Sequence, residues 1–156
     1  QKLQSFAILL FIINTANFIS NSIIEKISIP PSITFIADKA FIRYNKLKEI
    51  SIPSSVISIG NYSFFRCESL KEISISPSVT SIGSNVFEGC TSLTQISIPS
   101  SVTSIGSSTF LGCSSLKEIS IPSSVTSIGN YAFFGCKSLS QLSIPSSISI
   151  DNLGIG

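Results

Sequence analysis

Residues 70–92 read LKEISISPSVTSIGSNVFEGCTS, and residues 93–115 read LTQISIPSSVTSIGSSTFLGCSS. The two stretches carry apolar residues, a glycine and a cysteine at the same places, 23 residues apart. A unit of this length is too short to close a hydrophobic core of its own, so each unit must bury its apolar face against the next. The sequence therefore predicts a solenoid.

The repeat extends in both directions from this stretch. Its consensus is L-x-x-I-x-I-P-x-S-V-x-x-I-G-x-x-x-F-x-x-C-x-x, and successive units start at residues 24, 47, 70, 93, 116 and 139. We therefore predict a solenoid over residues 24–148 and an irregular end over residues 149–156. Because the chain has no methionine and its last unit lacks a polar cap, we expect it to be a fragment of a longer array.

The first 23 residues fit two interpretations. Leu10, Ile13 and Phe18 stand in the apolar columns of the unit, which favours a degenerate first coil, or N-terminal cap, over residues 1–23. The apolar run that starts at Phe6, with Lys2 before it, alternatively resembles a signal peptide. The run is shorter than the roughly 18 residues that a spanning helix needs, so a transmembrane helix is not expected.

Each unit contains two β-prone pieces and a turn. The segment 70–75 alternates apolar and polar residues at its isoleucine end, and the following proline ends this strand because it cannot donate to a sheet. A second piece runs over residues 79–83, and residues 85–90 allow at most one helical or 3₁₀ turn. The glycine that closes the second piece is predicted to need a positive φ at a corner. In the three central units this glycine is Gly83, Gly106 and Gly129.

The apolar columns predict a core that runs the length of the stack. The residues expected to form it at the centre of the chain are Ile75, Ile98, Phe87, Phe110, Cys90 and Cys113. The four cysteines, Cys67, Cys90, Cys113 and Cys136, form one column. Stacked strands lie about 4.8 Å apart, which exceeds the roughly 3.8 Å between Cβ atoms in a disulfide, and a straight column cannot surround a metal tetrahedrally. We expect buried free thiols and no metal site.

Composition excludes several classes of function. The chain has no histidine, so the usual base and the usual metal ligand are both missing, and its many serines sit in repeat columns where none is distinctive. We predict no enzymatic activity and no cofactor. The net charge of +2 is spread over neighbouring lysine and glutamate residues and forms no basic stripe, so nucleic acid is not an expected partner.

Two sets of residues are candidates for a binding surface. The first set is polar and points outward from the strands: Glu49, Lys71, Glu72, Gln95, Lys117 and Glu118. The second set is aromatic and follows the glycine: Tyr62, Tyr131 and Phe134. The strand set has no Trp, Tyr or Arg anchor, so affinity would have to come from many weak contacts. The aromatic residues either pack between turns or form a binding edge.

The unit resembles a leucine-rich repeat of the BspA type, a family associated with surface proteins. The resemblance covers residues 24–148 and is carried in one unit by Leu47, Ile50, Ile52, Val56, Ile59, Gly60, Phe64 and Cys67. It implies an α/β solenoid, a right-handed superhelix with a parallel β-sheet on its concave side and short turns or 3₁₀ pieces on the other. It also implies an adhesion module at the cell surface or in a secreted protein, with matrix proteins such as fibronectin or cell-surface proteins as partners.

Two other functions stay open at this point. The apolar ending, residues 150–155, suggests an array that self-associates end to end into a filament. The aligned pairs Thr80-Ser81, Thr103-Ser104 and Thr126-Ser127 suggest, more weakly, an ice-binding solenoid. Buried thiols are compatible with a reducing compartment as well as with an extracellular one, so the cytoplasm is also an open localisation.

Overall fold

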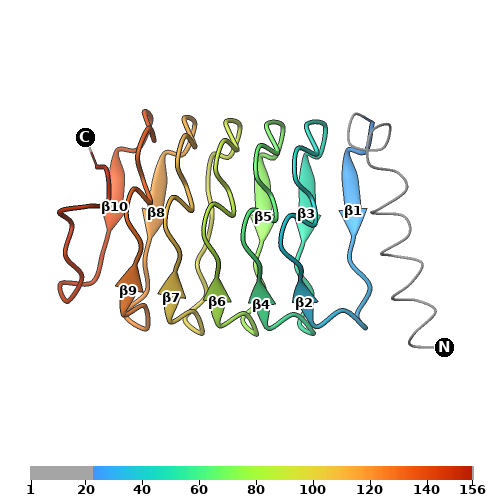
Figure 1. The fold of residues 1–156 in the computed structure, drawn as a ribbon, viewed down its shortest axis with the longest axis horizontal. Helices are drawn as coiled ribbons and strands as arrows, with labels where there is room; N and C mark the ends of the chain where they lie inside the picture. Colours follow the sequence, from blue (N-terminus) through green and yellow to red (C-terminus); the bar gives the residue numbers. More distant parts are fainter. Residues whose placement is uncertain (1–22, 156) are drawn as a thin grey trace.

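The chain folds into a stack of coils, seen side-on in Figure 1, and the structure, a computed structural model, describes residues 23–155. Every strand pairing joins residues 23 positions apart, such as Ile27 with Ile50 and Ile50 with Ile73. Because each coil repeats the preceding one in register, equivalent side chains form straight columns. The predicted solenoid is confirmed. The predicted N-terminal cap lies outside the described residues, apart from Ile23.

The first strand of each coil forms one face of the stack, which we call the strand face. Its strands are β1 (Lys26–Ser28), β3 (Glu49–Ser51), β5 (Glu72–Ser74), β8 (Glu118–Ser120) and β10 (Gln141–Ser143). They form a parallel three-stranded sheet, β1-β3-β5, and a parallel pair, β10-β8. The coil between β5 and β8 contributes a single bridge, from Gln95 to Glu118. The strand face is thus continuous in register but interrupted in its strand pairing, although Thr94 N donates to Lys71 O at 3.3 Å.

The second piece of each coil forms a second parallel sheet that has no such interruption. Its strands are β2 (Phe35–Ile36), β4 (Ser58–Ile59), β6 (Ser81–Ile82), β7 (Ser104–Ile105) and β9 (Ser127–Ile128), paired in that order. The isoleucine of each pair points into the core, whereas the residue before it faces outward. This sheet lies along the lower row of arrows in Figure 1.

A third row of hydrogen bonds joins the turns that follow the glycine, which we call the turn side. Phe64 N donates to Val86 O at 3.0 Å, and the same bond recurs from Phe87 N to Thr109 O at 2.9 Å. The prediction of at most one helical turn holds, because these residues form hydrogen-bonded turns and no helix occurs within residues 23–155. The segment before the C-terminus joins the same row, since Asn152 O accepts from Tyr131 N at 2.6 Å.

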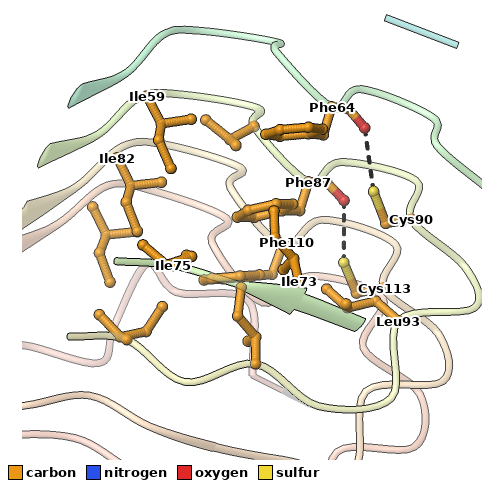
Figure 2. Packing of buried hydrophobic residues seen from close by; sticks show 14 of the residues in the cluster. Ile59, Phe64, Ile73, Ile75, Ile82, Phe87, Cys90, Leu93, Phe110 and Cys113 are labelled. Atoms are coloured by element: carbon orange, nitrogen blue, oxygen red, sulfur yellow. Dashed lines mark hydrogen bonds between the residues drawn. The ribbon is translucent and has the colours of Figure 1, made fainter. Parts of the chain in front are cut away.

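The core between the three sides is built from columns of identical side chains (Figure 2). The phenylalanine rings stack face to face from Phe41 to Phe133, with centroids 5.2 to 5.7 Å apart and planes within 15° of parallel. Leu153 is also buried. The residues expected at the centre of the core are all at most 8% exposed: Ile75, Ile98, Phe87, Phe110, Cys90 and Cys113.

The predicted reason for the glycine column is wrong. Gly83, Gly106 and Gly129 do not have positive φ. A Cβ atom on Gly106 would instead lie 2.4 Å from the backbone of Gly83 and Ser84, so the glycine is needed because neighbouring coils approach too closely for a side chain. Positive φ occurs further along the turn, in two other columns. These columns hold Lys39, Tyr62, Asn85, Ser108 and Tyr131, and Arg43, Arg66, Gly89, Gly112 and Gly135.

Candidate protein-binding face

The strand face carries a long open groove with a volume of about 1250 Å³, lined by residues from every coil between β1 and β10. Its floor follows the column of strand residues that point into the core: Ile27, Ile50, Ile73, Ile96, Ile119 and Leu142. One wall is the column Lys26, Glu49, Glu72, Gln95, Glu118 and Gln141, and the other wall is the serine column Ser28, Ser51, Ser74, Ser97, Ser120 and Ser143. The groove runs along the stack and crosses the strands, so a ligand in it would meet Lys26 and a serine in the first coil, and one acidic or amide side chain and one serine in each later coil.

The structure divides the predicted polar set between two places. Glu49, Glu72, Gln95 and Glu118 line the groove, whereas Lys71 does not. Lys117 lines a smaller hollow of about 420 Å³ beside the groove. The lysines lie one residue earlier in the chain and are exposed, so they form a basic rim next to an acidic wall.

Ion pairs on this face join neighbouring coils. Lys26 Nζ lies 2.5 Å from Glu49 Oε1, and Lys48 Nζ lies 2.9 Å from Glu25 Oε2. The first coil has the order Glu-Lys where the second has Lys-Glu, so opposite charges become adjacent when the coils stack. Each pair is exposed and contributes at most about 1 kcal/mol.

The predicted aromatic residues lie on the turn side, away from the groove. The ring of Tyr62 meets Phe65 edge to face at 5.7 Å, and Arg66 lies over the Phe65 ring at 5.5 Å from its centroid. Tyr131 and Phe134 form a similar edge-to-face pair at 6.3 Å and are 58% and 57% exposed. The two clusters are three coils apart, so the turn side carries two separate aromatic pairs.

A ladder of side chains after the glycine was not anticipated from the sequence. Asp38 Oδ1 accepts from the backbone N of Asn61 at 2.7 Å, and Asn61 Oδ1 accepts from the backbone N of Ser84 at 2.8 Å. The Oγ atom of Ser84 accepts in the same way from Ser107 N at 3.2 Å. The signal in the sequence was a small polar residue directly after the glycine in most units. The ladder joins neighbouring coils, so we assign its side chains a structural role and do not count them in the binding surface.

The four thiols form a buried column next to the phenylalanines, and all four are free. Cys90 Sγ donates to Phe64 O at 3.2 Å and Cys113 Sγ to Phe87 O at 3.1 Å, as the dashed lines in Figure 2 show. Burial raises the pKa of the Cys67 thiol to about 12 and that of Cys136 to about 11. Burial also raises the pKa values of the Cys90 and Cys113 thiols well above their usual range.

These thiols are expected to resist alkylation while the chain is folded, because the reactive thiolate is suppressed and the sulfur atoms are shielded from reagent. Treatment with iodoacetamide at neutral pH should leave all four cysteines unmodified by mass spectrometry. Denaturation without reductant should then make all four available. A linked Cys67-Cys90 or Cys113-Cys136 peptide would contradict the column.

Three further questions raised by the sequence concern a metal site, a membrane-spanning helix and an ice-binding surface. Within residues 23–155, no group of three or more His, Cys, Asp or Glu side chains could hold a metal ion. No helix in the same range has the length and apolar character needed to cross a membrane. The hydroxyls of Thr80, Thr103 and Thr126 donate to carbonyls of the preceding coil at 3.2 to 3.4 Å, which leaves them less able to order water.

The far end of the stack exposes apolar side chains. Ile150 is 60% exposed and Ile155 is 49% exposed, and β10 has a partner on one side only. Self-association through this end stays a prediction, which sedimentation velocity of the full chain would test.

These features define a repeat solenoid of parallel β-coils, and the comparisons agree. The family described as "BspA type Leucine rich repeat region (6 copies)" matches residues 34–153. The chain therefore belongs to the BspA-type leucine-rich repeat family. No curated protein matches it.

Solved bacterial structures resemble the chain closely. A leucine-rich repeat protein from Bacteroides ovatus is 40% identical, with a TM-score of 0.76 over 80% of this chain and 34% of its own. A leucine-rich cell surface protein from Faecalibacterium prausnitzii is 38% identical, with a TM-score of 0.74 over 77% of this chain and 32% of its own. A leucine-rich repeat protein of T. pallidum is 28% identical, with a TM-score of 0.73 over 81% and 72%. The chain spans about a third of the length of the first two.

Proposed function

We propose that this chain is a non-enzymatic protein-binding module that works in adhesion, at the cell surface or in a secreted protein, and that it uses the strand face. The groove that crosses every coil is the observation that carries this proposal. It offers a ligand the same kinds of polar side chain from coil after coil. The similar protein from Faecalibacterium prausnitzii is named as a cell surface protein, which supports the proposed location at the cell surface.

The groove suits affinity built from many small contributions. Its walls are exposed glutamate, glutamine and serine side chains together with Lys26, and they contain no aromatic or arginine side chain that could serve as an anchor. Interfaces with strong single contacts are enriched in Trp, Tyr and Arg, which are missing from this lining. The affinity for a partner that spans several coils should therefore depend on the number of coils it touches.

Removal of whole coils is expected to weaken binding in steps. Deletion of residues 70–92 joins Ser69 to Leu93 and keeps every core column in register, and deletion of residues 70–115 removes a further coil. We expect each deletion to lower the affinity for immobilised fibronectin, measured by surface plasmon resonance. Both deletions keep Tyr62, Tyr131 and Phe134, so loss of the aromatic pairs cannot explain the result.

The control for this experiment is the full-length double variant Tyr131→Ala with Phe134→Ala. It should keep its affinity if the strand face is the binding surface. A double variant that has lost binding, with its fold intact by circular dichroism, would assign binding to the turn side instead. Full affinity in both deletion variants would also assign binding to the turn side.

A further inference from the structure

Two carboxylates in the groove lack partners within the described part of the chain. The Glu49 carboxylate is neutralised by Lys26, but the side-chain carboxylates of Glu72 and Glu118 make no ion pair or hydrogen bond with any of residues 23–155. Both side chains are exposed on the same wall. They leave the central part of the groove with two uncompensated negative charges that a ligand can meet.

One coil, represented on this wall by the neutral Gln95, separates the two carboxylates. Two steps between stacked strands of about 4.8 Å each place their attachment points roughly 10 Å apart along the groove. In a polyproline II helix, residues three apart face the same way and lie about 9.3 Å apart. In an extended β-strand, residues that face the same way recur every 6.8 Å or so, which does not match.

The backbone of the strand face supports the same choice of ligand. Strand addition needs a free sheet edge, but the groove crosses the sheet face, where the backbone groups of β1, β3, β5, β8 and β10 lie in the sheet plane and pair with neighbouring coils. The middle coil, which contains Gln95, keeps one bridge, to Glu118. Only side chains project into the groove. A polyproline II peptide needs no partner strand because its backbone is fully solvated. Its carbonyls can accept hydrogen bonds from the exposed hydroxyls of Ser74, Ser97 and Ser120.

We propose that the groove binds a segment of a partner protein that is in the polyproline II conformation and carries lysine or arginine at every third residue. The segment runs along the stack, with one cation on Glu72 and the next on Glu118. This inference rests on the function proposed above and names the partner chemistry of the same face. The rim lysines lie outside the groove lining, with Lys117 in the neighbouring hollow.

Two synthetic peptides of identical composition test the spacing: acetyl-(Lys-Pro-Pro)₄-amide and acetyl-(Lys-Pro)₄-(Pro)₄-amide. With the full chain and isothermal titration calorimetry at low salt, the first peptide should bind about fivefold more tightly, because it can form both exposed ion pairs at once whereas the second can form only one. Its affinity should fall as salt is added. Equal affinities for the two peptides, or no binding of either, would overturn the inference.

Matched variants of the chain locate the contact. The double variant Glu72→Gln with Glu118→Gln should remove the preference for the first peptide, whereas Lys71→Gln with Lys117→Gln should keep it. All four side chains are exposed, so the fold is expected to survive in each case. Loss of this preference in both double variants would show that it does not depend on the two carboxylates in particular and would overturn the inference. Fibronectin binding that weakens with each deleted coil would still support the proposed function.

Discussion

Phe87→Ala is expected to lower the free energy of unfolding by about 3 to 5 kcal/mol, the range measured for loss of a buried ring. The side chain is fully buried, and its ring stacks on Phe64 and Phe110 at 5.6 and 5.7 Å. The backbone on either side is held to the next coil by hydrogen bonds, so the cavity cannot close easily. Urea denaturation followed by circular dichroism measures the change.

Ser97→Ala is the matched control for this substitution. Ser97 is exposed in the serine wall of the next coil, so its loss should change the stability by no more than roughly 0.5 kcal/mol. Similar losses at the two positions would mean that the inward and outward faces of the coil are interchanged.

Gly106→Ala is expected to have the second-largest effect, a loss of about 3 kcal/mol or more, at the upper end for overpacking. The new methyl group would lie 2.4 Å from the backbone of Gly83 and Ser84. A side chain could rotate away from such a contact, but the backbone of the preceding coil cannot, so two coils would have to separate. Thermal unfolding by circular dichroism, with the wild-type chain alongside, measures the change.

Gly112→Ala separates close approach from backbone conformation. Gly112 has φ +72°, and a Cβ atom there would be 3.8 Å from its nearest neighbour, which is an ordinary contact. Only the left-handed conformation opposes alanine, at a cost of about 1 to 2 kcal/mol. If Gly112→Ala proved more damaging than Gly106→Ala, conformation would be the dominant reason for glycine in this fold.

The repeat made most of the fold predictable from sequence. A residue that recurs every 23 positions must occupy equivalent places in stacked coils, so the isoleucine, phenylalanine and cysteine columns followed directly. The purpose of a recurring glycine did not follow, because a periodic pattern shows that a position is restricted without showing how. For a second glycine column, that of Gly89, the first two units did contain a usable signal. Arg43 and Arg66 occupy the same column, which shows that it has room for a side chain.

The candidate site was predictable only in part. Outward-facing polar positions could be recognised from the alternation with buried isoleucines. The separation of the acidic wall from the basic rim could not be recognised, because it depends on the residue at which each strand begins. The strands begin at the glutamate, so the preceding lysine lies in the segment that leads into the strand. The ion pairs were also missed, because neighbours in the sequence, such as Lys48 and Glu49, pair with the coil before them and not with each other.

The reversed charge order of the first coil makes the coils unequal as building blocks. Their interiors are interchangeable, since any coil offers the same columns to its neighbours. Their surfaces are not, because Glu49 faces Lys26 on one side and Glu72 on the other. A duplication or loss of coils after the second would lengthen or shorten the stack and leave the ion pairs between the Glu-Lys coil and its Lys-Glu neighbour in place. Changes in length within this part of the array are therefore compatible with a conserved charge contact at one fixed junction between two coils.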